Sequence, residues 1–247
     1  MMVGRSDGRT VGRWCVCWRA IGSLVLLSVG PTVRLSVGQV GHEPGQSPYH
    51  DIRRGGVGVI TFGYLGGSRG GPGVGISDGP TGGLRYEVAF GNALGASLGI
   101  AYAQTTRFVV DPTKDSLSRR SGSFDTDVVL ADVALQLALT GRKTWHGFAP
   151  YVGGAFGVAL GGGSPPDPSG YVFGTKLTVA PGAGLRWYPA RRVSVRTDFR
   201  LVLWRLNYPL GYKQPSTIDG SRVLPLDAPL TEWTAHPWIT IGLGWTF

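Results

Sequence analysis

The stretch that decides the fold is Pro237-Trp-Ile-Thr-Ile-Gly-Leu-Gly-Trp-Thr-Phe247, at the C-terminal end of the chain. Threonine or glycine separates its large apolar residues, which occupy every second position: Ile239, Ile241, Leu243, Trp245 and Phe247. Successive side chains of a β-strand point to opposite faces, so this pattern predicts a strand with one bulky apolar face and one small face. A helix would distribute the same side chains around its circumference.

The same alternation recurs from residue 55 onward and predicts seven further strands before the C-terminal one. They are expected at residues 55–65, 81–90, 93–107, 125–140, 148–160, 172–188 and 192–206. The segment 125–140 is the best check on this prediction: odd positions hold Val129, Ala131, Val133, Leu135, Leu137 and Leu139, and even positions hold Asp132, Ala134, Gln136 and Ala138. Leu, Ala and Gln are good helix formers, so a helix is the alternative there, but the unbroken alternation favours a strand.

The connections between the expected strands alternate between long and short. The long ones, at 66–80, 107–124, 161–171 and 207–232, are rich in glycine, proline or charged residues. No stretch after Gly30 approaches 18 apolar residues without a break, which excludes a helical membrane span after that residue. An even number of strands with alternating long loops and tight turns is typical of bacterial outer-membrane barrels.

The C-terminal pattern resembles the closing strand of small eight-stranded bacterial outer-membrane β-barrels of the OmpA, OmpX and OmpW type. The resemblance covers about residues 55–247. It implies that residues 239–247 carry the signal read by the barrel-assembly machinery, and that outer-membrane lipid surrounds the barrel. It further implies a structural or adhesive surface protein, or a narrow passage for small hydrophobic molecules, located in the outer membrane after export through the periplasm.

Residues 1–38 predict a cleavable signal peptide: an arginine-rich front precedes a short apolar run, Ala20–Gly30, and small residues follow. Residues 39–54 are polar and predict a flexible periplasmic lead-in. The two cysteines, Cys15 and Cys17, lie within the leader. A chain without the leader would contain no cysteine, which excludes a disulfide scaffold and a thiol enzyme.

Composition agrees with a barrel and argues against nucleic-acid binding. The chain has 41 glycines, and only 16% of its residues are charged. Its formal charge of +9 falls to +5 without residues 1–38, which hold five arginines and one aspartate. The remaining basic residues form no basic helix or aromatic-basic module, so we expect no nucleic-acid partner.

The polar side chains of the expected strands fall on the face opposite the bulky apolar ones. The set comprises Arg85, Glu87, Asp132, Gln136, Arg186, Arg196, Asp198 and Arg200. In a membrane barrel the bulky residues meet lipid and the polar ones face the lumen. The lumen of an eight-stranded barrel is just wide enough for side chains, so we expect arginine–carboxylate pairs that largely fill it. Arginine outnumbers carboxylate in this set, which leaves room for water or a bound anion.

The predicted fold is therefore all-β: a closed, antiparallel, eight-stranded up-and-down transmembrane barrel preceded by a signal peptide. We expect no catalytic residues, metal or cofactor, since none of His42, His50, His146 and His236 belongs to a local serine–carboxylate motif. Two alternatives stay open, a lipid-modifying barrel enzyme and a soluble ligand-binding barrel of the lipocalin type.

Two further expectations concern the ends of the barrel. The four long loops are expected to contact a ligand outside the cell. Aromatic residues near the strand ends are expected to form interfacial girdles: Trp187, Tyr188, Trp204, Tyr208, Trp233, Trp238 and Trp245.

Overall fold

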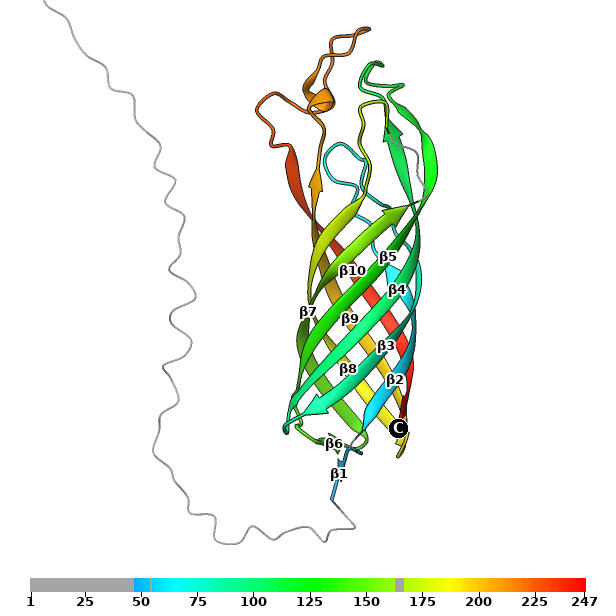
Figure 1. Ribbon diagram of the computed structural model, residues 1–247, viewed down its shortest axis with the longest axis vertical. Coiled ribbons are helices and arrows are strands. Elements are labelled where there is room, and N and C mark those ends of the chain that lie inside the picture. Colours follow the sequence, from blue (N-terminus) through cyan, green and yellow to red (C-terminus); the bar gives the residue numbers. More distant parts are fainter. Residues whose placement is uncertain (1–46, 54, 163–166) are drawn as a thin grey trace, which may run out of the picture. The chain divides into compact units, whose positions relative to one another are not determined.

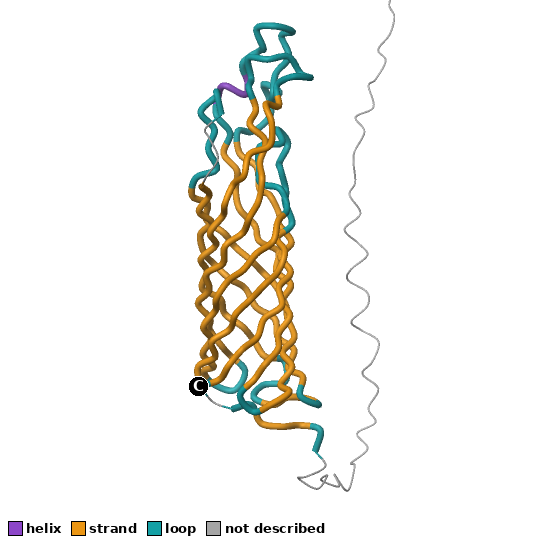
Figure 2. The backbone as a smooth tube through the Cα atoms, turned by 90° about the vertical axis from the view of Figure 1, so that its right-hand side faces the viewer, coloured by secondary structure: helices purple, strands orange, loops and turns teal. Residues whose placement is uncertain are grey.

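The computed structural model describes residues 47–53, 55–162 and 167–247. The predicted leader, residues 1–38, and the first part of the predicted lead-in, residues 39–46, lie outside the described residues. Eight long strands form a barrel with its long connections at one end and its short turns at the other (Figures 1 and 2). These strands are β2 (Gly56–Leu65), β3 (Gly79–Phe90), β4 (Leu94–Val110), β5 (Arg120–Ala138), β7 (Phe148–Gly162), β8 (Thr175–Ala190), β9 (Val193–Asn207) and β10 (Thr231–Thr246).

Every one of these strands pairs antiparallel with two neighbours. The order around the wall is β7-β5-β4-β3-β2-β10-β9-β8, and β7 pairs with β8 to close the ring. The closing strand β10 pairs with β2 from Trp238↔Leu65 to Thr246↔Val57. Closure leaves the sheet of the barrel without a free edge, as the interior of a membrane requires. The predicted eight-stranded up-and-down barrel is confirmed.

A second, smaller strand pair lies at the end with the short turns and was not expected. β1 (Tyr49–Asp51) pairs antiparallel with β6 (Lys143–Trp145). β6 then turns back into β7 through His146 and Gly147, whose φ values of 51° and 83° suit a two-residue hairpin turn. Strands of three residues are too short to show alternation, so the sequence predicts only a lead-in and a turn here.

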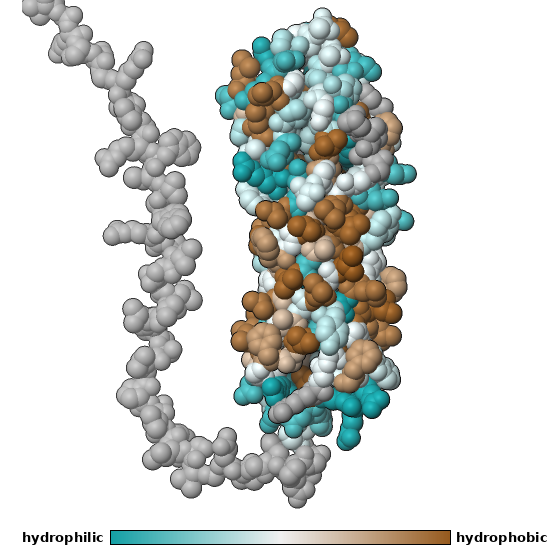
Figure 3. All heavy atoms as spheres, in the orientation of Figure 1, coloured by the Kyte–Doolittle hydropathy of each residue, from teal (hydrophilic) through white to brown (hydrophobic). Residues whose placement is uncertain are grey.

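The outer surface of the barrel is apolar, and the charged side chains predicted for the lumen point inward. Leu135 and Ile241 are 61% and 55% exposed, whereas Arg196 is 1% exposed. Hydrophobic residues gather over the middle of the barrel, and hydrophilic ones gather toward its two ends (Figure 3). This arrangement is that of a membrane-spanning barrel and the reverse of a lipocalin, so the soluble alternative is wrong. Among the described residues, no helix is long and apolar enough to cross a membrane.

The prediction of aromatic girdles is only partly right. Trp187, Trp233 and Trp245 face outward, but Trp204 and Trp238 are buried in the lumen. Two of the remaining girdle candidates also fail: Tyr208 is buried and Tyr188 is half-buried. The inward tryptophans have the same strand parity as Arg196 or Thr240, and parity decides the face whether or not a residue lies near a strand end.

Candidate functional site

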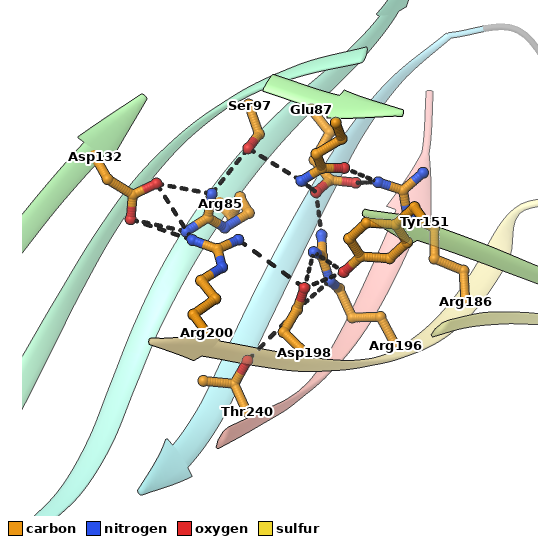
Figure 4. A network of polar contacts seen from close by, with 11 residues as sticks. Arg85, Glu87, Ser97, Asp132, Tyr151, Arg186, Arg196, Asp198, Arg200 and Thr240 are labelled. Carbon is orange, nitrogen blue, oxygen red and sulfur yellow. Dashed lines mark hydrogen bonds and ion pairs between the residues drawn. The ribbon is translucent and has the colours of Figure 1, made fainter. Parts of the chain in front are cut away.

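The candidate site is the lumen, whose half nearer the short turns is occupied by a network of charged side chains (Figure 4). Asp132 of β5 accepts two hydrogen bonds of 2.9 Å from Arg85 of β3, one on each carboxylate oxygen. Arg200 of β9 approaches the same carboxylate to 3.4 Å, and Arg85 also donates to Ser97 Oγ at 2.8 Å. A bidentate guanidinium–carboxylate pair is among the strongest polar contacts in proteins.

Glu87 and Asp198 form the second part of this network. Glu87 is shared by Arg186, at 3.0 Å, and by Arg196, with which it forms a close ion pair. Arg196 also donates to Asp198 through Nε and Nη2, at 2.7 and 2.6 Å. Arg200 lies 4.0 Å from Asp198 and so joins the two parts.

All eight residues named from the sequence therefore lie in one network, because Gln136 also donates to Glu87 and accepts from Arg186. Sequence analysis missed three members: Ser97, Tyr151 and Thr240. Tyr151 donates to Asp198 and accepts from Arg196 Nη2 at 2.5 Å, and Thr240 Oγ1 lies 3.4 Å from Asp198. Inward parity is the signal that could have found them. We call these eleven residues the ionic layer.

Glycines on the neighbouring strands make room for the arginines of the ionic layer. Arg85 is directly opposite Gly99, Arg200 opposite Gly182, and Arg196 opposite Gly242. A Cβ at Gly99 would lie 2.7 Å from Arg85 Nη2, and one at Gly182 would lie 2.8 Å from Arg200 Cγ. The lumen is too narrow for side chains on both partners, so each of these arginines fills the space that a glycine leaves.

The ionic layer is tightly filled and nearly neutral. Four arginines face three carboxylates, so pairing removes most of the cost of burying these charges. A cavity beside Asp198 and Arg200 has a volume of about 10 Å³, which is the lower limit for one water molecule. The layer therefore acts as packing and excludes a wide aqueous pore at this level.

Above the ionic layer, toward the long loops, aromatic side chains fill the lumen. Trp204 stacks on His236 with ring centroids 3.9 Å apart, and the edge of Phe173 meets Trp204 at 5.7 Å. Trp238 donates from Nε1 to Thr81 Oγ1 at 3.0 Å. We call Phe173, Trp204, His236 and Trp238 the aromatic layer. Its histidine contacts Gly66 O and Thr234 Oγ1, and neither partner is the carboxylate that a catalytic histidine uses.

The first long loop, residues 66–78, enters the mouth of the barrel. Its residues 72–77 are buried, and Val74 and Ile76 belong to the same apolar cluster as Trp204 and Leu65. The expectation that this whole loop contacts an outside ligand is therefore wrong for residues 72–77. A glycine-rich loop can fold inward when it carries apolar residues whose burial is favourable.

A buried ion pair ties the end of β4 to the third long loop at the same end of the barrel. Arg107 lies 2.8 Å from Asp167, and neither side chain is exposed. Asp167 also accepts from the Val110 amide at 3.1 Å and from the Tyr212 hydroxyl at 2.8 Å. Burial, and then this hydrogen bond, raise the pKa of Tyr212, so its hydroxyl stays protonated and donating. We call Arg107, Asp167 and Tyr212 the loop clasp.

The tips of the second and fourth loops are joined by further hydrogen bonds. The Ser116 amide donates to Asp219 at 3.0 Å, and Ser216 Oγ donates to Thr113 O at 3.0 Å. The short helix η2 (Leu210–Lys213) begins the fourth loop. These contacts join two segments that are about a hundred residues apart in sequence. We call the second and fourth long loops, residues 111–119 and 208–230, the crown.

The residues of the expected assembly signal lie on the outer face of β10 or directly after it. Ile239, Ile241, Leu243 and Trp245 are exposed, and so is Phe247. The Phe247 amide donates to Gly56 O at 3.0 Å, which extends the pairing between β10 and β2 by one residue. Within the described part of the chain, no group of three or more His, Cys, Asp or Glu side chains could hold a metal ion.

No family model matches the sequence, and no curated protein matches it. Solved structures do match. The outer membrane protein OprG from Pseudomonas aeruginosa is 15% identical with a TM-score of 0.49, covering 80% of this chain and 98% of its own. Neisserial surface protein A is 9% identical with a TM-score of 0.45, covering 81% and 98%. The Yersinia pestis attachment protein Ail, solved with the heparin analogue sucrose octasulfate, is 17% identical with a TM-score of 0.37, covering 78% and 99%.

Proposed function

We propose that this protein is an integral β-barrel of the bacterial outer membrane that holds a rigid crown of loops outside the cell for contact with a partner. One observation carries the contact role: the ordered crown exposes large apolar side chains to water. Leu117 is 94% exposed, and Leu210, Ile218 and Leu226 are also strongly exposed. Apolar residues gathered on a protein surface mark interaction sites more often than scattered single ones do.

Membrane insertion is supported by the outer face of the barrel. Bulky apolar residues cover the middle of the wall, and polar residues lie at both ends (Figure 3). Transmembrane barrels of this kind, with long loops at one end and short turns at the other, belong to outer membranes. We accordingly assign the long loops to the outside of the cell and the short turns to the periplasm.

The filled lumen supports a scaffold role and counts against a passage along the barrel axis. The ionic layer and the aromatic layer follow one another along the barrel axis. The first loop buries its residues 72–77 above them. A solute on this route would have to displace paired charges, each of which is costly to leave unpaired. A narrow passage for small hydrophobic molecules is therefore the weaker form of the proposal.

The proposal also holds that the barrel has no enzymatic activity. Of the three histidines among the described residues, His236 is the one buried in the lumen, and its ring contacts a carbonyl and a hydroxyl. A lipid-modifying enzyme would change the acylation of lipid A. We expect mass spectra of lipid A from cells with and without the protein to be identical; an altered acyl pattern would overturn this part.

Trypsin on intact cells tests the orientation. Arg222 lies in the exposed fourth loop, and Arg191 lies in a short turn at the other end. We expect cleavage after Arg222 while Arg191 stays protected until the outer membrane is opened. Cleavage at Arg191 alone would reverse the assignment.

The contact role is tested by reducing the apolar surface of the crown. The double variant Leu117→Ser, Ile218→Ser removes two exposed apolar side chains, and Leu139→Ser, 60% exposed near the short turns, is the matched control. We expect the double variant to lower the partition of cells into hexadecane, and their aggregation, to the level of cells without the protein. An unchanged double variant would sink the contact role.

We further propose that residues 239–247 are read by the barrel-assembly machinery. The bulky residues of this segment point outward and are free to be contacted before the barrel closes against lipid. Deleting Phe247 should lower the amount of folded, heat-modifiable barrel severalfold, whereas Phe247→Tyr, which keeps the aromatic ring, should not. Normal folded levels in the deletion would refute the assignment.

A further inference from the structure

A cavity of about 150 Å³ lies below the ionic layer, at the end of the barrel with the short turns. Its described lining residues include four arginines, Arg53, Arg142, Arg186 and Arg196, and one carboxylate, Glu87. Glu87 is already shared by Arg186 and Arg196. The wall of the cavity therefore has a clear excess of positive charge, in a partly enclosed space where water screens charges less than in bulk solution.

Arg186 is the member of the ionic layer that is best placed to receive a ligand. Its side chain is 19% exposed, more than any other ion-paired side chain of the layer, while Arg196 beside it is 1% exposed. Its Nη2 contacts Glu87 and Gln136, and its guanidinium lies 4.5 Å from the centre of the Tyr151 ring. Its buried Nε has no hydrogen-bond partner among the described residues. A ligand would therefore meet the exposed part of this side chain and not the buried Nε.

Arg142 supplies a second cation at the rim of the same cavity. Arg142 lies in the second short turn, and its Nε donates a hydrogen bond of 2.6 Å to Gly91 O in the first short turn, which holds it in place. No ion pair within 4.0 Å is found for it among the described residues, since the pairs that exist involve other arginines. An arginine held at a cavity rim in this way is ready to bind an anionic group.

Small apolar side chains make up much of the rest of the wall, beside the polar Asn92, Gln136 and Ser194. Val57, Ala89, Ala138 and Ala149 line it together with several glycines. A cavity of this size can hold a molecule as large as benzene. A fully hydrated phosphate would lose its water against these apolar groups, whereas a carboxylate on an apolar body would match both parts of the wall.

We propose that this cavity is a binding site for a small amphipathic carboxylate, whose anionic group meets Arg186 and Arg142 and whose apolar body packs among the alanines. The site is separate from the loop crown and faces the periplasm in the proposed orientation. If this binding proposal failed, the contact role of the crown would still stand, because the cavity and the crown lie at opposite ends of the barrel.

The test uses the full-length barrel in a non-ionic detergent and follows binding of 4-fluorobenzoate by ¹⁹F NMR. We expect saturable binding, and at least a tenfold loss of affinity in Arg142→Gln and in Arg186→Gln. Arg191→Gln, a rim arginine outside this cavity, should bind as the unmodified protein does. Because Arg186→Gln disturbs the ionic layer, Arg186→Lys and the heat-modifiable mobility of each variant check that the barrel still forms.

Two further ligands decide the chemical class. Equal binding of 4-fluorobenzyl alcohol, which lacks the charge, would overturn the proposal in favour of a purely apolar cavity. Displacement of 4-fluorobenzoate by inorganic phosphate at equal concentration would overturn it in favour of a site for any anion. Undetectable binding of 4-fluorobenzoate, or identical affinities in Arg142→Gln and Arg191→Gln, would also refute it.

Discussion

The two halves of the lumen are packed with opposite chemistry inside the same wall. Near the short turns the ionic layer places arginines and carboxylates at hydrogen-bonding distance, as in the Arg85–Asp132 pair at 2.9 Å. Near the long loops the aromatic layer and the apolar cluster around it place rings and aliphatic groups in contact. Trp238 marks the boundary, because its ring lies 5.8 Å from the Arg200 guanidinium.

This difference shows that a narrow barrel can be filled either from its own strands or from its loops. Every charged member of the ionic layer comes from a strand of the wall. The filling of the other half includes Val74, Ile76 and Phe173, all of which come from loops. The first half is therefore a property of the strands alone, whereas the second half also requires the loops to fold inward.

The largest expected effect comes from removing one charge of the ionic layer. Arg196→Met would leave Asp198 without its main partner, and Glu87 would keep one ion-pair partner, Arg186. Breaking a buried ion pair on one side costs about 3–5 kcal/mol. We expect the free energy of unfolding in lipid vesicles, followed by tryptophan fluorescence in urea, to fall by that amount. Arg191→Met, an arginine in a short turn, is the control.

A double variant sharpens this prediction. If the cost comes from the unpaired carboxylate, adding Asp198→Asn to Arg196→Met should restore part of the loss, so that the two changes are not additive. Additive losses, or a loss below about 1 kcal/mol in Arg196→Met, would mean that the charges are accessible to water and that the lumen is less filled than its geometry indicates.

The same comparison explains what the sequence could and could not predict. Arg196, Asp198 and Arg200 lie in a regular strand, where parity alone assigns their face. Trp204 has the same parity and points inward, although its position near a strand end predicts an interfacial tryptophan. Asp167 lies in a loop without any period, and its partners at 107 and 212 are far away in sequence. No local pattern encodes such a contact.

An intermediate effect is expected at the loop clasp. Asp167→Asn keeps an acceptor for Tyr212 and for the Val110 amide but removes the charge that Arg107 faces. Hydrogen bonds to charged groups contribute about 1.5–3 kcal/mol. Two of the three clasp members, Asp167 and Tyr212, lie in loops, and Arg107 lies near the loop end of β4. The loss should therefore appear mainly as local opening at this end, with the unfolding midpoint of the barrel nearly unchanged.

Trypsin measures this local opening, because a protease must loosen the segment around its cut. Cleavage after Arg222 should become roughly ten- to a hundredfold faster in Asp167→Asn, following from the same 1.5–3 kcal/mol. Asp227→Asn, in the same loop but outside the clasp, should cleave at the original rate. A lower unfolding midpoint with unchanged cleavage would show that the clasp belongs to the barrel rather than to its loops.

The smallest effect is expected at the hydroxyl groups around the ionic layer. Thr240 Oγ1 lies 3.4 Å from Asp198, which keeps its contacts with Arg196 and Tyr151 when that hydroxyl is removed. Thr240→Val should therefore cost less than about 1 kcal/mol. Tyr151→Phe should cost more, because the Tyr151 hydroxyl contacts both Asp198 and Arg196. The reverse order would indicate that the layer depends on small polar groups at the wall, and that its charges are not the main filling of this half of the lumen.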